Sequence, residues 1–134
     1  MTHSLYFKIV FKDYNDGLRE FISEFKNDEE FLDTYQLKIS RGFGSGSYRM
    51  IGDSQPFIYF SESDDEEFVI DIETGSHVAP EDRLYSLQWY YFTLAFTDRF
   101  EDILKELGAI WYYHLEGDDD VHLNEKQMLK KIND

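Results

Sequence analysis

The chain has 134 residues, with 28 acidic and 13 basic side chains and a formal net charge of −15, and its length fits one domain over residues 1–134. An aromatic content of 18% excludes a disordered acidic tail, and the lack of cysteine excludes disulfide bonds and thiolate chemistry. The acidity argues against binding to nucleic acid or to an anionic membrane, and no apolar run approaches the ~18 residues of a membrane span, so we expect a soluble, cytoplasmic protein.

The first third of the chain predicts a strand, a helix and a second strand. Residues 4–12 are short, aromatic and β-branched, which favours a strand. Asn15 and the two residues after it offer a turn or a helix N-cap. A helix follows, because apolar side chains recur there at helical spacing, at Leu18, Phe21, Ile22 and Phe25. Residues 35–41 alternate apolar and polar side chains, as a half-buried strand does.

The middle of the chain predicts an antiparallel meander. Strands are expected at 48–51, 57–61 and 68–73, separated by turn residues and by an acidic hexapeptide, Glu62 to Glu67. The glycine–serine loop at 42–47 lies between two predicted strands. A phosphate-binding loop leads from a strand into a helix, so this loop is interpreted as a hairpin connection.

Residues 84–96 are ambiguous because they are apolar nearly throughout. They could form a buried helix, but their aromatic content and partial alternation favour a strand. An internal comparison supports the strand, since residues 6–13 align with residues 91–98. A second helix is then expected from an N-cap at Thr97 or Asp98 to Gly108.

The last part of the chain predicts a strand at 109–115 and a short helix at 124–132. The elements together predict an α+β fold in the order β-α-β, β-meander, β-α-β, followed by a short C-terminal helix. Its largely antiparallel sheet would have about six or seven strands and two amphipathic helices on one face, since such helices must bury their apolar stripes.

Two acidic runs and the aromatic residue Tyr112 supply the candidate partner-binding residues. The run at the predicted hairpin tip could reach into a basic cleft, because carboxylates pair well with Arg and Lys. The second run follows the last strand, next to aromatic side chains of the kind enriched at interfaces. The predicted partner-binding residues are Glu62, Asp64, Asp65, Glu66, Glu67, Tyr112, Asp118, Asp119 and Asp120.

Catalytic and metal-binding motifs are absent from the sequence, so no catalytic residue, metal or cofactor is predicted. His114 and His122 bracket the second acidic run, but no metal-ligand spacing links them to His3 or His77. With 28 acidic residues, two neighbouring carboxyls indicate a site only where one is buried with a shifted pKa.

These observations favour a non-enzymatic binding domain that neutralises a basic, nuclease-like protein partner, such as an immunity protein or an inhibitor that mimics the charge of DNA. One alternative is a ligand-binding or enzymatic domain with a pocket between sheet and helices, which a buried His77 or His114 with a shifted pKa would favour. Another is a structural role as a homodimer or larger homo-oligomer, which a symmetric contact burying Trp89 or Trp111 would favour.

Overall fold

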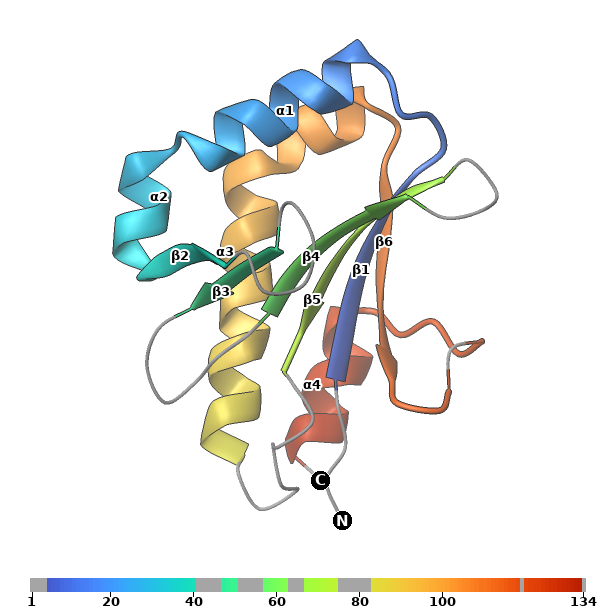
Figure 1. The fold of residues 1–134 in the computed structure, drawn as a ribbon. Coiled ribbons are helices and arrows are strands. Elements are labelled where there is room, and N and C mark those ends of the chain that lie inside the picture. The colour runs from blue at the N-terminus through green and yellow to red at the C-terminus, as the bar shows by residue number, and fades with distance from the viewer. Residues whose placement is uncertain are drawn as a thin grey trace.

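The computed structural model describes residues 5–40, 47–50, 57–62, 67–74, 83–118 and 120–133, and only the backbone of 38–40, 47–50 and 61–62. The fold is α+β, with one antiparallel sheet and four helices (Figure 1). The strands are β1 (Leu5–Phe11), β2 (Leu37–Ser40), β3 (Ser47–Met50), β4 (Phe57–Glu62), β5 (Phe68–Glu73) and β6 (Ile110–Leu115). The helices are α1 (Asp16–Lys26), α2 (Glu29–Thr34), α3 (Arg83–Glu106) and α4 (Glu125–Asn133).

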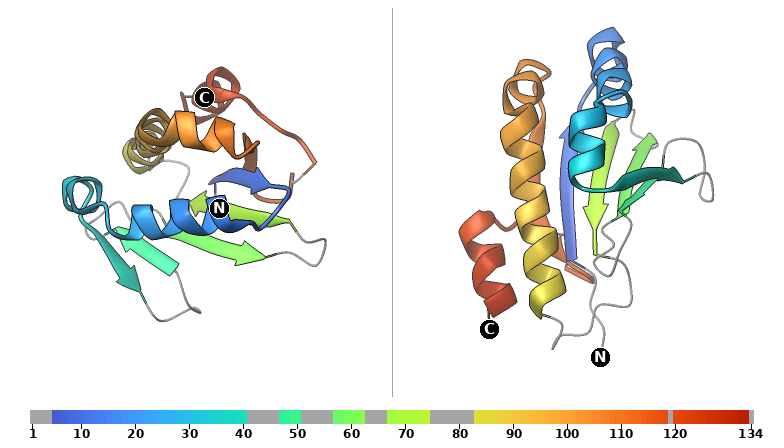
Figure 2. Two further views of the ribbon diagram at one scale, coloured as in Figure 1. Left: turned by 90° about the horizontal axis from the view of Figure 1, so that it is seen from above. Right: turned by 90° about the vertical axis from the view of Figure 1, so that its left-hand side faces the viewer.

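The sheet has the order β2-β3-β4-β5-β1-β6, and every neighbouring pair is antiparallel. The predicted meander is therefore confirmed as β3 to β5. Strand β2 extends it at one edge, and β1 lies between β5 and β6. Helices α1, α2 and α3 pack over one face, and α4 lies beside α3 and β6 (Figures 1 and 2). No helix in the described parts of the chain covers the other face, which we call the open face.

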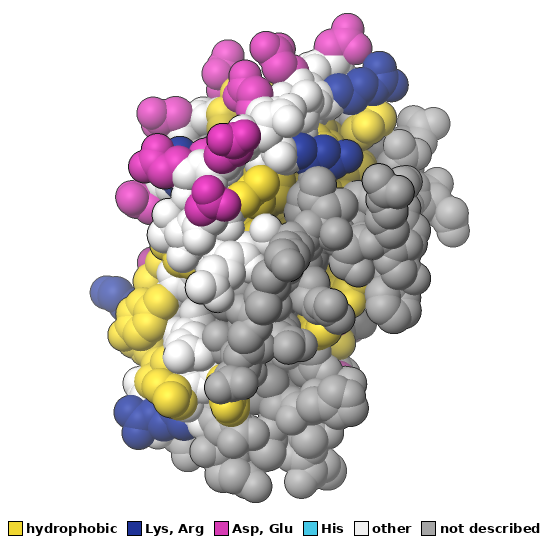
Figure 3. Space-filling view, turned by 60° about the vertical axis from the view of Figure 1, so that its left-hand side comes forward, with side chains coloured by type: hydrophobic (Ala, Val, Ile, Leu, Met, Phe, Trp, Pro, Cys, Tyr) yellow, Lys and Arg dark blue, Asp and Glu magenta, His cyan; other side chains and the backbone are white. Residues whose placement is uncertain are grey.

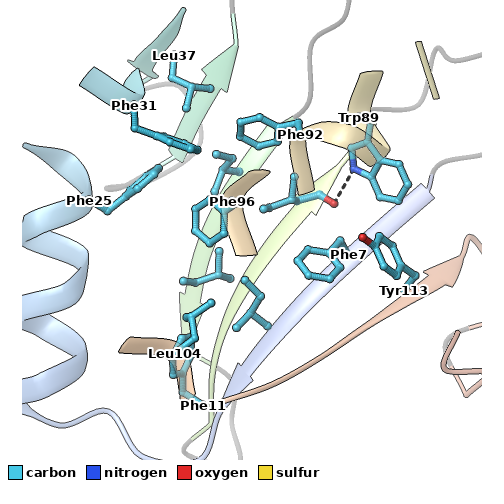
Figure 4. Packing of buried hydrophobic residues seen from close by; sticks show 14 of the residues in the cluster. Phe7, Phe11, Phe25, Phe31, Leu37, Trp89, Phe92, Phe96, Leu104 and Tyr113 are labelled. Carbon is cyan, nitrogen blue, oxygen red and sulfur yellow. Dashed lines mark hydrogen bonds between the residues drawn. The ribbon is translucent and has the colours of Figure 1, made fainter. Parts of the chain in front are cut away.

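Alternation along β1 assigns its side chains to the two faces. Leu5, Phe7, Ile9 and Phe11 are buried under the helices, and the residues between them are half-buried on the open face. The interior is filled by aromatic side chains from β1, α1, α2 and α3 (Figure 4). The Trp89 indole N–H also donates a hydrogen bond to the Ile72 carbonyl of β5, at 3.0 Å. Together these contacts tie α3 to the sheet.

Local signals explain how three helices begin or end. The Asn15 side chain accepts a hydrogen bond from the Leu18 N–H at 3.0 Å, which confirms the predicted N-cap of α1. Asn124 and Gln127 exchange side-chain to backbone hydrogen bonds of 2.9 Å at the start of α4, a capping box. Gly108 follows α3 with φ +72°, a backbone conformation that favours glycine.

The prediction of a strand within 84–96 is wrong, because α3 runs without a break from Arg83 to Glu106. Its buried positions include Ser86, Trp89, Thr93, Phe96 and Leu104, which recur at helical spacing. This helix contacts the sheet, α1 and α2, and α4, so a broad stripe of it is aromatic and its pattern resembles that of a strand.

The proposed internal repeat is wrong for the same reason. Residues 6–13 contain β1, whereas residues 91–98 lie inside α3. The second β-α-β unit therefore lacks its first strand. Thr97, predicted as an N-cap, is a buried mid-helix residue whose hydroxyl donates to the Thr93 carbonyl at 3.0 Å. The short helix α2 follows α1, and the Asp28 side chain caps it.

Candidate functional site

The open face of the sheet gathers ionisable and aromatic side chains from four strands. The register places Tyr6 of β1 between Glu73 of β5 and His114 of β6. It places Lys8 between Asp71 and Tyr112. Directly opposed residues of antiparallel strands project to the same face, so these side chains lie side by side. We call the half-buried set the open-face cluster, and it consists of Tyr6, Lys8, Tyr59, Asp71, Glu73 and Tyr112.

Two carboxyl groups form the centre of this cluster. Asp71 and Glu73 are two residues apart on β5, so they project to the same face roughly 6.6 Å apart along the strand. Burial and, next, the negative charge of Asp71 raise the pKa of Glu73 to about 7, although the positive charge of Lys8 opposes them. This pair meets the condition that sequence reasoning set for an informative carboxyl pair.

Aromatic side chains border the carboxyl pair on its neighbouring strands. Tyr59 of β4 lies opposite Asp71, and Phe57 lies opposite Glu73. The rings of Phe57 and Tyr59 are 6.0 Å apart and nearly parallel, with an angle of 25°. Burial and the charges of Glu73 and Asp71 raise the pKa of the Tyr59 hydroxyl. The two carboxyls therefore lie in a surface that aromatic rings partly shield from water.

The two described histidines are held in ring stacks near β6. His114 is buried and stacks on Tyr6 with ring centroids 4.7 Å apart, and His122 stacks on Tyr112 at 3.6 Å. His3 and His77 lie outside the described residues. Within the described ranges, no three His, Asp or Glu side chains converge as metal ligands. The arrangement thus packs imidazole rings against tyrosines at one end of the open-face cluster.

The second predicted acidic run follows the strand that borders this cluster. Asp118 and Asp120 are exposed in the turn after β6, and the Asp118 N–H donates to the Leu115 carbonyl at 3.0 Å. Asp119 lies outside the described residues. Glu116 in the same turn is close enough for its charge to raise the pKa of Glu73. The structure therefore brings Tyr112 and this turn to the end of the sheet that carries Glu73.

The first predicted acidic run lies at the other end of the sheet. Glu62 ends β4 and pairs with Phe68, whereas Glu73 is five residues farther along β5, roughly 16 Å away. Glu67 is exposed just before β5, and Asp64, Asp65 and Glu66 lie outside the described residues. The two predicted runs are thus separated by the length of β5.

Sequence reasoning missed the carboxyl pair at the centre of the site. Its only local signal was the alternation of residues 68–73, in which Asp71 and Glu73 occupy every second position. That pattern predicts a shared face but not the neighbours on it, because the strand order decides which tyrosines stand opposite. Of the neighbouring aromatic residues, Trp89 and Tyr113 are buried in the core, whereas Tyr112, the one predicted to bind a partner, is half-buried on the open face.

Comparisons with known proteins give no relative for this chain. No protein family matches it, and neither the curated proteins nor the solved structures contain a match. None of the described helices is both long enough and apolar enough to span a bilayer.

Proposed function

We propose that this chain is a non-enzymatic binding protein that neutralises a basic protein partner, and that the open-face cluster contacts this partner. The observation that carries the proposal is the half-buried carboxyl pair of Asp71 and Glu73 among tyrosines. Burial and the neighbouring carboxyl disfavour the charged form of Glu73, and Lys8 offsets this only in part, so a further cation that approaches would stabilise it. An Arg or Lys side chain of the partner would supply that cation.

The surroundings of the pair suit a protein partner. Tyr6, Tyr59 and Tyr112 present rings on a sheet face, and tyrosine is enriched among residues that dominate binding energy. Their rings can also attract a guanidinium or ammonium group. A net charge of −15 would speed the approach of a basic protein.

The class of partner follows from the arrangement of the acidic groups. Glu116, Asp118 and Asp120 follow β6 beyond the cluster, so negative charge continues past the carboxyl pair. A nuclease-type protein has a cationic cleft for its nucleic acid, and a surface of this kind would occupy it as a charge mimic. This supports an inhibitor or an immunity-type role.

A pull-down from a lysate of the source cells, at low and at high salt, tests the proposal. The bait is used as wild type, as the double variant Asp71→Asn/Glu73→Gln, and as a control with the same chemical change on α1, Glu20→Gln/Glu24→Gln. We expect wild type and control to retain a basic protein at low salt, and the open-face variant to lose it. Equal retention by all three baits would reject the open face as the binding surface.

A second candidate function is binding of a small cationic ligand or acid–base chemistry on it. The pKa of Glu73, about 7, favours this candidate, because such a carboxyl can give or accept a proton near neutral pH. If no protein is retained, thermal-shift screening of amines and guanidines against wild type and Glu73→Gln tests it. A homo-oligomeric role is a third proposal, for which sedimentation velocity is the test. Trp89 would take no part in that contact, because only 2% of it is exposed.

A further inference from the structure

A separate groove lies on the helical side of the molecule, between α3, β6 and α4. It has a volume of about 440 Å³, and Leu94, Ala95 and Trp111 supply its apolar lining. Trp111 is half-buried and also lines an adjoining groove of about 420 Å³ beside α4. Trp111 therefore lines two neighbouring grooves at the outer edge of the sheet, and Lys126 is also among the residues that line the second.

The backbone of β6 is open at this groove. The N–H and C=O groups of Tyr113 both bond to Leu123, at 2.9 and 2.7 Å, so they point away from β1. Outward and inward groups alternate along an antiparallel strand, so the N–H and C=O groups of Trp111 point outward as well. Across the described residues, no backbone hydrogen bond outside the β1–β6 ladder joins Trp111.

The pairing of Leu123 with the edge strand β6 does not extend to Trp111. Antiparallel pairing of Leu123 with Tyr113 would continue as Glu125 with Trp111, but Glu125 already begins α4. The segment around Leu123 that pairs with β6 therefore ends one residue pair before it would reach Trp111. An added strand at this place would satisfy the outward groups of Trp111, which is how a peptide joins an exposed sheet edge.

The charge of the groove selects the kind of segment that fits. Its lining includes the acidic residues Asp98 and Glu101 of α3 and Glu125 of α4, and none of its described lining residues is Lys or Arg. Lys105 pairs with Glu101 at 2.8 Å, so Asp98 and Glu125 are the two acidic residues of the lining on which the proposal rests. An extended segment with basic side chains would meet carboxylates and an indole ring together.

We propose that this groove binds an extended basic segment of a partner protein, which adds as a strand beside Trp111 and places an Arg or Lys side chain between Asp98 and Glu125. The surface is distinct from the open-face cluster, although a basic partner suits both. Variants at each surface therefore distinguish failure of one proposal from failure of the other.

Titration with the peptide acetyl-Val-Arg-Val-Arg-Val-amide, followed by NMR, tests this inference. We expect saturation to slow hydrogen exchange of the Trp111 amide about tenfold or more, because the added strand accepts its hydrogen bond. We expect Asp98→Asn/Glu125→Gln to weaken binding about tenfold, the loss of one charge-assisted hydrogen bond.

Three controls make the outcome decisive. Glu20→Gln/Glu24→Gln carries the same chemical change on α1, and Asp71→Asn/Glu73→Gln carries it on the open face. The α1 variant should bind the peptide as wild type does, and the open-face variant should show the same slowing of Trp111 amide exchange at saturation. A peptide with the same sequence and N-methylated backbone amides should not bind, since it cannot pair as a strand. Equal affinity of the N-methylated peptide, equal weakening by all three double variants, or unchanged Trp111 exchange at saturation would overturn the proposal.

Discussion

Glu73 is a half-buried carboxyl that the fold holds in an unfavourable place for a negative charge. Asp71 lies on the same strand face, and Tyr6 and Phe57 lie opposite on the neighbouring strands. Burial, with Asp71, raises its pKa from an ordinary 4.5 to about 7, so the folded chain keeps a proton that the unfolded chain releases. The contribution of Glu73 to the free energy of unfolding is therefore present at low pH, and it is lost as the pH rises from 4.5 through the pKa of about 7.

Glutamine cannot ionise, so replacing Glu73 by Gln removes the free-energy cost of a negative charge at this half-buried position. We expect Glu73→Gln to have a free energy of unfolding about 1–2 kcal/mol above wild type at pH 8, a value reduced for solvent screening of a half-buried group. The difference should shrink as the pH falls toward 4.5. Urea unfolding of both proteins between pH 5 and pH 8 measures it, with the pH values chosen to bracket a pKa of about 7.

Glu20→Gln is the matched control, because it makes the same chemical change at an exposed position of α1. Its effect on unfolding should stay nearly constant over the same pH range. A constant difference for Glu73→Gln as well would show that Glu73 ionises in the folded chain as it does in the unfolded one.

Helix α3 connects the parts of the molecule that carry the two proposed surfaces. The hydroxyl groups of Thr93 and Tyr113 lie 2.6 Å apart, which joins the helix to β6. The Tyr90 hydroxyl donates to the Glu125 carbonyl at 3.1 Å, which joins the helix to α4. Buried hydrogen bonds of this kind position elements, because leaving one member unpaired costs more than the bond contributes. The groove beside Trp111 thus depends on α3 for its shape.

Leu104 tests whether α3 is packed as described. Its side chain is fully buried near the end of the helix, so Leu104→Ala should lower the free energy of unfolding by ~2–5 kcal/mol by leaving a cavity. Leu84→Ala makes the same change on the same helix at a side chain that is 65% exposed, and should cost less than ~0.5 kcal/mol. Chemical denaturation measures both. Similar costs for the two substitutions would contradict the burial of Leu104.

The molecule as a whole presents acidic side chains at several places. They gather over one end of the helical layer (Figure 3), where α1, α2 and the last turns of α3 carry exposed Asp and Glu. Others follow β6, and Glu67 is exposed just before β5. Because these groups act together at long range, the approach of a basic partner depends on their sum, whereas the bound complex depends on local contacts.

The acidic run between β4 and β5 allows a test of its own contribution. Reversing Asp64, Asp65 and Glu66 to Lys changes the net charge by 3 × 2, from −15 to −9. We expect association with a basic partner to slow about tenfold at low salt and by less at high salt. We expect the three substitutions to alter the free energy of unfolding by less than ~0.5 kcal/mol. Stopped-flow mixing with the retained partner at two salt concentrations measures the rates.

An equal reversal elsewhere separates this run from net charge alone. Glu20, Glu24 and Asp102 are exposed on α1 and α3, and their reversal to Lys gives the same net charge. If both triple variants slow association equally, the run acts only through the total charge and not as a docking element.

The sequence by itself determined those elements that have one apolar side. Aromatic and β-branched content located β1, alternation located β2, and turn residues separated the strands of the meander. Helical spacing with Asn15 located α1, and apolar spacing located α4. In these segments the pattern of a few neighbouring residues indicates both the type of structure and the side that it buries. The element can therefore be predicted without knowing its contacts with distant parts of the chain.

Only the tertiary structure decided the conformation of residues 84–96 and the composition of the open-face cluster. Helix α3 is covered by the sheet and by other helices, so most of its positions are apolar and its period is obscured. Glu73 acquires its shifted pKa from burial on a face shared with β1 and β4, which no local pattern contains. The physical reason is the same in both cases: burial and strand register depend on contacts between residues far apart in the chain.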